Sequence, residues 1–295
     1  MNTKKIFTIL PLIVFINTSI SLSAQDFQTL TYYEDDSIKL ELDLFLPESH
    51  ANAKVPLVIY AHGGGFSTGN RTGGHKLGKF LKEQNIAVAS ISYTLYMKDK
   101  SFSCDGELTE KIKAIQLASN QLWLSTEFFL NNQDKYNFDP EQIFLAGSSA
   151  GAEAVLQAAF WDREIMSLYE INLPEKFKYS GVISGAGAIM DLNLITQDSL
   201  IPVMMFHGDS DPVVPYATAA HHYCSTDASG WLMLFGSKSI YNHIMDLKGT
   251  VSLITYIEGT HSAAGAHFYQ NQQPVNDFIN QVIQGEVFQN HKQKF

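Results

Sequence analysis

A serine stands at the centre of Gly147-Ser148-Ser149-Ala150-Gly151, which fits the pattern G-x-S-x-G. An apolar run ends at Ala146, just before the motif, and an alanine-rich helical stretch follows it. This context is typical of a sharp strand-to-helix turn, which requires small residues two positions either side of the serine and lifts its hydroxyl clear of the sheet. We therefore predict that Ser149 is a nucleophile. Ser148 is the alternative, but the small residues flanking it would be alanines rather than glycines.

A glycine-rich loop, His62-Gly63-Gly64-Gly65-Phe66, directly follows the apolar run Leu57–Ala61. Consecutive glycines cost conformational entropy, so a chain keeps them where its backbone must come close to something. We predict that the N–H groups of Gly64 and Gly65, joined by that of Ala150, bind an oxyanion. His62 is expected to shape the loop through a side-chain hydrogen bond. A phosphate-binding loop is the competing interpretation, but the Lys and Ser/Thr spacing of a P-loop is missing.

The elements that must position these residues alternate along the chain. Apolar runs predict strands buried on both faces, at residues 56–61, 86–93, 142–146, 181–185, 202–206 and 251–257. Helical patterns occupy residues 75–84, 107–130, 150–161, 216–223 and 274–283. This alternation predicts a mostly parallel sheet with helices on both faces. Functional residues then lie on loops at the carboxyl ends of strands.

The segments 29–33 and 38–46 precede these units and read as two strands. The second alternates apolar and polar residues, and the polar turn Asp35-Asp36-Ser37 separates it from the first. These features predict an antiparallel hairpin at the start of the sheet.

The order and placement of the two motifs, HGGGF and then GSSAG, resemble the α/β-hydrolase superfamily. The sequence is similar to the carboxylesterase/lipase branch that carries an HGGG-type oxyanion loop. The resemblance covers essentially the whole chain after its first 24 residues, and its motifs are specific for the fold and the chemistry but not for a substrate. It implies an α/β-hydrolase fold in which the serine is followed by an acid and then by a histidine.

The resemblance implies an acid after the strand 202–206. That strand runs into His207-Gly208-Asp209-Ser210-Asp211-Pro212-Val213-Val214-Pro215, which is similar to the family's HGxxDxxVP-like segment. The residue that matches the family's acid is Asp211. Asp209 is the alternative, although a short Asp side chain at that position is expected to cap the turn.

The resemblance also implies a histidine after the last strand, 251–257. His261 follows that strand closely, and Gly259 and Thr260 suit a turn. His267 is the alternative, but it falls near the start of the last helix. The remaining candidates, His221, His222 and His243, are expected to be surface or structural residues. In the implied mechanism His261 takes the proton of Ser149, and Asp211 orients and stabilises the imidazole.

The first 24 residues have the layout of a secretory signal peptide. Lys4 and Lys5 precede the apolar run Ile6–Ile16, and small and polar residues follow up to Ala24. Cleavage after Ser23 is the alternative to cleavage after Ala24. The run is short for a membrane span, and no cysteine follows it, so neither a membrane anchor nor a lipid anchor is expected. We predict a secreted or periplasmic protein with one catalytic domain at residues 25–295.

The chain contains two cysteines, Cys104 and Cys224. An even number in an exported protein favours a disulfide, and two free buried thiols are the alternative. Both lie in segments without regular structure, so a bridge between them would tie two pocket walls together.

Composition excludes several other classes of protein. The chain of 295 residues has a formal net charge of −10 and no basic run beyond its N-terminus, so nucleic-acid binding is not expected. No paired-histidine metal motif and no dinucleotide-binding motif is found, so no metal and no cofactor is expected.

Three functions fit the motifs. The first is a carboxylesterase acting on small acyl esters, with acetyl or feruloyl esters of carbohydrates as candidates. The second is a serine peptidase of the prolyl-peptidase type, and the third is a non-catalytic binding module. Glu153 is a further candidate to line the pocket, because it lies one helical turn beyond Ser149.

Overall fold

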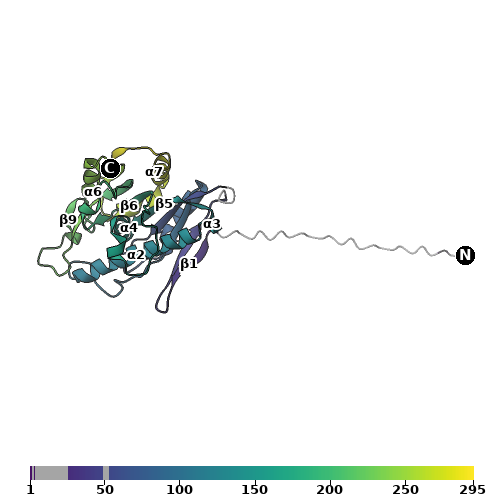
Figure 1. Cartoon of the computed structure of the whole chain (residues 1–295), viewed down its shortest axis with the longest axis horizontal. Helices are drawn as coiled ribbons and strands as arrows, with labels where there is room; N and C mark the ends of the chain where they lie inside the picture. Colours follow the sequence, from purple (N-terminus) through teal and green to yellow (C-terminus); the bar gives the residue numbers. More distant parts are fainter. Residues whose placement is uncertain (2, 4–25, 49–52) are drawn as a thin grey trace.

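The computed structural model describes residues 1, 3, 26–48 and 53–295. A nine-stranded sheet runs through the molecule in the order β1-β2-β4-β3-β5-β6-β8-β11-β12 (Figure 1). Its strands are β1 (Gln28–Glu34), β2 (Lys39–Phe45), β3 (Val55–Ala61), β4 (Ala87–Ile91), β5 (Phe138–Ser148), β6 (Gly181–Gly185), β8 (Val203–Gly208), β11 (Val251–Tyr256) and β12 (Gln289–Lys294). Strand β2 pairs antiparallel with β1 and β4, and every other pairing in this sheet is parallel. The predicted fold class is confirmed.

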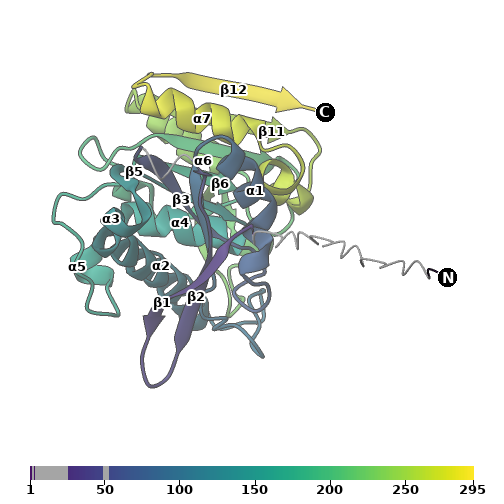
Figure 2. The same ribbon diagram turned by 90° about the vertical axis from the view of Figure 1, so that its right-hand side faces the viewer.

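Helices pack on both faces of this sheet (Figure 2). One core joins alternate strand residues to apolar side chains of α2 (Leu108–Asn131), α4 (Ala150–Phe160) and α6 (Ser237–Asp246). The other core joins the remaining strand residues to α1 (His75–Glu83) and α7 (Gln273–Ile283). In β3, for example, Leu57 and Ile59 belong to the first core, and Val58 and Tyr60 belong to the second. This alternation follows from the two-residue period of a strand.

A smaller antiparallel sheet lies beside the main one. It has the order β7-β10-β9, with β7 (Ala188–Ile189), β10 (Met233–Gly236) and β9 (Thr218–Ala220). The prediction of a helix at 216–223 is therefore wrong. Ala219 pairs with Leu234 of β10, and only His221–Tyr223 forms a short 3-10 turn. Pairing with a distant strand overrides the local helix propensity of the alanines.

The sequence patterns missed β12, β10 and α6. Strand β12 reads QNHKQK and is largely exposed, so it carries no apolar alternation to detect. It joins the sheet through its backbone, in parallel with β11. The remaining short helices are α3 (Gln133–Tyr136), α5 (Arg163–Met166), the 3-10 turns Arg71–Gly74, Leu192–Leu194 and His261–Gly265, and the π-turn Ala266–Gln270.

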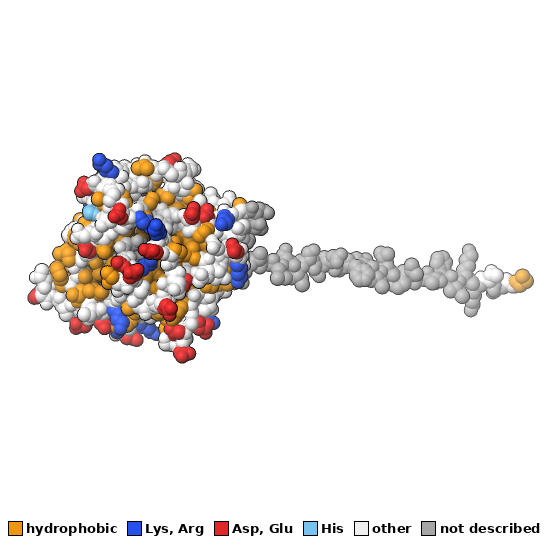
Figure 3. Space-filling model, viewed as in Figure 1, with side chains coloured by type: hydrophobic (Ala, Val, Ile, Leu, Met, Phe, Trp, Pro, Cys, Tyr) orange, Lys and Arg blue, Asp and Glu red, His pale blue; other side chains and the backbone are white. Residues whose placement is uncertain are grey.

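The surface mixes charges of both signs. On the face drawn in Figure 3, acidic and basic side chains are interspersed, and no continuous basic surface covers the described residues there. None of the helices in the described ranges is long and apolar enough to cross a membrane. The predicted signal peptide, residues 1–24, lies almost entirely outside the described residues, so it stays a prediction.

Candidate active site

Ser149 lies in a tight turn between β5 and α4. Its backbone has φ 54° and ψ −123°, a positive-φ conformation that is uncommon for a residue with a side chain. The turn brings backbones together so closely that a Cβ on Gly147 would lie 2.3 Å from the carbonyl oxygen of Gly151. A Cβ on Gly151 would lie 2.2 Å from the carbonyl oxygen of Ala61. The two glycines of the motif are thus required by packing, as the sequence indicated.

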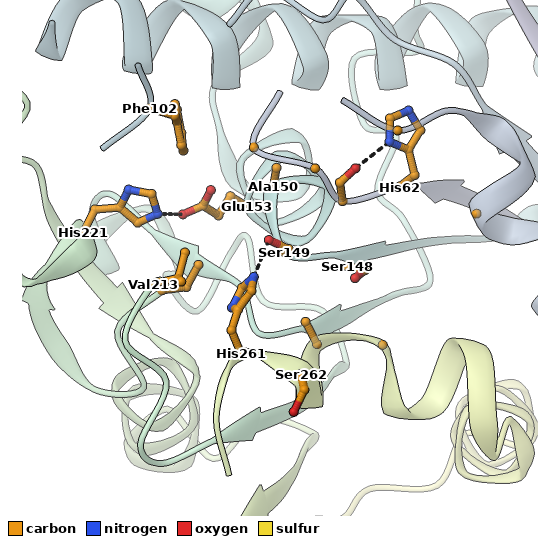
Figure 4. Close-up of a pocket in the computed structure, with 18 of the residues that line it drawn as sticks. His62, Phe102, Ser148, Ser149, Ala150, Glu153, Val213, His221, His261 and Ser262 are labelled. Carbon is orange, nitrogen blue, oxygen red and sulfur yellow. Dashed lines mark hydrogen bonds and ion pairs between the residues drawn. The ribbon is translucent and has the colours of Figure 1, made fainter. Parts of the chain in front are cut away.

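Three side chains from three loops form a hydrogen-bonded chain. Ser149 Oγ lies 2.7 Å from Nε2 of His261 (Figure 4), and Nδ1 of His261 lies 2.7 Å from Oδ2 of Asp211. The loops follow β5, β11 and β8, whose carboxyl ends meet at one edge of the sheet. The structure therefore brings together the three residues that the sequence placed far apart.

Asp211 is buried and bound on both oxygens. Oδ1 accepts hydrogen bonds from the amides of Val213 (2.8 Å) and Val214 (3.1 Å), and Oδ2 also lies 3.2 Å from Nε2 of His207. Burial alone would raise the pKa of this carboxyl, but the hydrogen bonds from His207 and His261 hold it well below its usual range. Asp211 is therefore ionised at neutral pH. Asp211 also caps the turn, through the bonds of Oδ1 to the two valine amides. We had expected Asp209 to cap this turn, but the carboxylate of Asp209 accepts from the Ser210 hydroxyl.

His62 fixes the first peptide of the glycine loop. Its ring stacks on Tyr93 at 4.3 Å, and burial lowers the pKa of the imidazole, so the ring is neutral. Nδ1 lies 2.7 Å from the carbonyl oxygen of Gly63, to which it donates. His62 thus makes the loop-shaping hydrogen bond that we expected.

A turn fixes the next peptide of the loop. The carbonyl oxygen of Gly64 accepts from the amides of Ser67 and Thr68, both at 3.0 Å. In a trans peptide the N–H points away from the preceding carbonyl. The Gly64 N–H therefore points away from the His62 ring, and the Gly65 N–H points away from the 67–68 turn. Gly64, Gly65 and Ala150 line the same cavity as Ser149.

This cavity has a volume of about 930 Å³ and opens beside the Ser149 hydroxyl. Its lining includes Asn70, Thr72, Tyr269 and Gln270. Phe102, Glu153, Val213 and His221 also line it, and they form the end that lies on one side of Ser149 (Figure 4). Figure 4 shows Glu153 and His221 facing each other on one side of Ser149, with Phe102 nearby. Glu153 thus lines the cavity, as the sequence suggested.

His221 was expected to be a surface or structural residue, and this expectation missed its place in the cavity wall. The side chain is buried, with Nε2 3.4 Å from Oε1 of Glu153. No local sequence pattern predicts that His221 lies in the cavity wall, because the pairing of β9 with β10 places it there. His243, in contrast, is structural and bonds the carbonyl oxygen of Ile195.

Cys104 and Cys224 form a disulfide, with their Cα atoms 5.3 Å apart. The bond ties the segment that carries Phe102 to the 3-10 turn that carries His221. The alternative of two free thiols does not occur in the structure. The bridge therefore fixes the wall of the cavity at this end.

The rejected alternatives have other surroundings. His267 is buried and bonds the carbonyl oxygen of Asn271 and the hydroxyl of Tyr256. Ser148 is buried at the end of β5, and the histidine bonds Ser149 in its place. Within the described ranges, no group of three or more His, Cys, Asp or Glu side chains is placed to hold a metal ion.

The nine-stranded sheet and the loops at its carboxyl edge define a member of the α/β-hydrolase superfamily. The model of the BD-FAE family matches residues 42–200, just over half of the chain, and the protein belongs to this family.

Several proteins of similar sequence are named as esterases or as a lipase. A probable isoprenylcysteine alpha-carbonyl methylesterase of Oryza sativa subsp. japonica is 25% identical over 248 residues, which cover 70% of this chain and 54% of the relative. A homologue of that enzyme in Arabidopsis thaliana is 32% identical over 117 residues (40% and 21%), and secreted lipase 5 of Gibberella zeae is 28% identical over 143 residues (45% and 26%). The matches thus span about a fifth to a half of the relatives' length.

Among solved structures, a thermophilic esterase from Thermogutta terrifontis with bound propionate has a similar fold. The TM-score is 0.63 at 12% sequence identity, and the match covers 89% of this chain and 96% of that chain. At this identity the likeness shows the fold alone.

Proposed function

We propose that this protein is a serine carboxylesterase that hydrolyses small acyl esters through an acyl-enzyme. The observation that carries the proposal is the chain from Ser149 Oγ to His261 Nε2 and from His261 Nδ1 to Asp211, at 2.7 Å each, which opens onto a cavity. The esterase and lipase relatives support the same reaction class.

The geometry assigns each group a task. His261 Nε2 takes the proton of Ser149 as the hydroxyl oxygen attacks the ester carbonyl, and Asp211 stabilises the imidazolium that forms. The N–H groups of Gly64, Gly65 and Ala150 stabilise the oxyanion of the tetrahedral intermediate. His261 then protonates the departing alcohol, and water releases the acid from the acyl-enzyme by the same steps.

The substrates that we propose are small acyl esters, including acetyl or feruloyl esters of carbohydrates. The proposed site of action is outside the cytoplasm, after removal of the signal peptide. The Cys104–Cys224 disulfide supports this, because such bonds persist in oxidising compartments.

Hydrolysis of 4-nitrophenyl acetate by residues 25–295 tests the proposal. We expect turnover by the wild type, loss of roughly 10⁴-fold or more in kcat for Ser149→Ala, and retained turnover for Ser148→Ala. A fluorophosphonate should label the wild type and not Ser149→Ala. Absence of both hydrolysis and labelling would contradict the proposal and favour a binding module. Faster cleavage of 4-nitroacetanilide than of the ester would favour a peptidase.

A further inference from the structure

One end of the cavity holds buried polar atoms that lack partners. Glu153 and His221 are each 1% exposed. The 3.4 Å between Oε1 of Glu153 and Nε2 of His221 is long for a hydrogen bond, and among the described residues neither Oε1 of Glu153 nor Nδ1 of His221 has a hydrogen-bond partner. Buried polar groups are almost always bonded, so orphaned ones in a cavity wall point to a ligand that supplies the missing bonds.

An aromatic side chain completes this end of the cavity. The Phe102 ring lies 5.1 Å from the His221 ring in an edge-on arrangement. Figure 4 shows the Glu153 carboxyl between Phe102, His221 and Ala150, on the side of Ser149 away from His62. An apolar wall with a few convergent polar groups is the usual composition of a specific ligand site.

The charges around this end favour a neutral ligand. Burial raises the pKa of Glu153 to about 8 and lowers that of His221 well below its usual value, so at pH 7 both side chains are uncharged. A protonated carboxyl and a neutral imidazole each contain one hydrogen-bond donor and can also accept a hydrogen bond. Burial also lowers the pKa of the nearby, fully buried Lys111, whose Nζ donates to the carbonyl oxygen of Gly230, and Lys100 at the rim pairs with Glu110.

A hydroxyl group matches these requirements, because it is neutral and both donates and accepts. We propose that Glu153, His221 and Phe102 form a subsite that binds a hydroxyl-bearing part of the ester substrate, as in an acylated polyol or sugar. This inference rests on the proposed esterase function and adds to it the residues that recognise the hydroxylated part of the substrate. Glu153 and His221 are then specificity-determining residues.

The position of Glu153 limits where the hydroxyl lies in the substrate. Glu153 lies in the first turn of α4, where its amide donates to the carbonyl oxygen of Ser149 at 3.0 Å, and both residues line the same cavity. We therefore expect the Glu153 carboxyl to reach hydroxyls within a few bonds of the reacting ester. Small substrates are therefore sufficient to detect the subsite.

Two substrate pairs test the inference and identify which side of the ester is bound. Propyl acetate against 1-acetylglycerol varies the alcohol, and methyl butanoate against methyl 3-hydroxybutanoate varies the acyl group. We expect the wild type to prefer the hydroxylated member of one pair by about tenfold in kcat/KM, which corresponds to about 1.4 kcal/mol. Glu153→Leu should bring that ratio close to one, and Glu153→Gln, whose amide also donates and accepts, should retain part of it.

Gln157→Leu is the matched control. Gln157 lies one turn further along α4, is equally buried and also has unbonded side-chain atoms, but it does not line the cavity. It should leave the wild-type ratio intact. Circular dichroism and melting temperature should establish that each variant is folded.

The outcomes separate the two proposals. The subsite proposal would be overturned if the wild type showed equal kcat/KM within both pairs, or if its preference survived Glu153→Leu. In either case, turnover of 4-nitrophenyl acetate would leave the esterase proposal intact. If no ester is hydrolysed, calorimetric titration of 1-acetylglycerol and methyl 3-hydroxybutanoate into Ser149→Ala and Ser149→Ala/Glu153→Leu still decides. Tighter binding of either ligand by the single variant supports the subsite, and equal or absent binding of both rejects it.

Discussion

Asp211 uses its two carboxylate oxygens for different tasks. Oδ1 bonds the amides of Val213 and Val214, and Oδ2 bonds Nδ1 of His261. The first contact shapes the loop, and the second keeps a proton on Nδ1 so that Nε2 is free to accept from Ser149. Because the tasks are divided between two atoms, one substitution can separate them.

Asp211→Asn is the substitution that separates the two tasks. The amide oxygen can still accept from the loop amides, while the NH₂ group donates to Nδ1 of His261 and moves the imidazole proton to Nε2. We expect kcat to fall roughly 10⁴-fold with the protein folded, as for the same change in other serine triads. Stopped assays and a melting curve check this, with Asp209→Asn as the control. A loss below tenfold would mean that Asp211 does not orient the histidine.

Glu153 gives stability a pH dependence that a variant can isolate. The folded-state pKa of Glu153, about 8, exceeds the ordinary value of 4.5 for a glutamate carboxyl, so the folded protein keeps a proton that the unfolded chain has lost. Stability must therefore fall as pH rises towards 8. The other titratable groups that face Glu153 are His221, His222, Lys111 and Asp211. Burial lowers the pKa values of both histidines from 6.5, so they titrate below the pH range in which Glu153 is tested.

Glu153→Gln removes this proton. From pH 6.5 to 8.5 we expect the unfolding free energy of the variant to gain about 2 kcal/mol relative to the wild type. Urea denaturation at several pH values measures the difference. Parallel stability curves for the two proteins would show that Glu153 titrates normally.

The individual active-site residues differ in how far sequence could identify them. Ser149 carries a local motif, and the chain order of the resemblance led to Asp211 and His261. Their hydrogen-bonded contact supports those assignments but leaves their roles as predictions. His221 has no motif, and its place depends on a strand pairing about a dozen residues away. Local patterns and the chain order of the resemblance therefore located the three residues of the hydrogen-bonded chain and missed part of the cavity wall around them.

At the level of elements, the loop after β3 illustrates how backbone conformation serves chemistry. Gly64 has φ 119°, and a Cβ there would lie 2.2 Å from the carbonyl oxygen of Thr68. Gly65 has φ 59°, and the nearest atom to a Cβ is Ser67 Oγ at 3.8 Å. The two glycines are therefore required for different reasons, one for space and one for conformation alone.

Gly64→Ala should displace the loop and its N–H donors. We expect kcat for 4-nitrophenyl acetate to fall about 10²–10³-fold, with a smaller change in KM. Gly65→Ala should cost much less, because it introduces only a backbone strain of about 1–2 kcal/mol without a clash. Steady-state kinetics of both variants tests this ordering. Equal effects would contradict the packing argument.

Strand and helix prediction succeeded where burial imposes a pattern. The strands that flank the active site are buried on both faces, and each was identified within a few residues. The prediction missed β9 because this strand is three residues long and alanine-rich, and it missed β12 because the side chains of that strand face solvent. The elements that position Ser149, Asp211 and His261 were thus the more predictable ones.

At the level of the whole molecule, the disulfide joins two distant parts of the chain. Cys104 and Cys224 are 120 residues apart in sequence, so the bond restricts the unfolded chain strongly. We expect reduction, or the double change Cys104→Ser/Cys224→Ser, to lower the unfolding free energy by about 2–5 kcal/mol. Guanidinium denaturation with and without dithiothreitol measures this, and a thiol count on the native protein should find none. Identical transitions with and without reductant would contradict the prediction.

The same bond has a consequence for the biogenesis of the protein. With two cysteines in the whole chain, oxidation within one molecule has a single product, so its maturation requires an oxidant but no isomerase to correct pairings. Cys104 is synthesised 120 residues before Cys224, so it stays an unpaired thiol until its partner emerges. The one wrong product open to it is a covalent bond to another molecule, and this bimolecular error becomes rarer as the protein becomes more dilute.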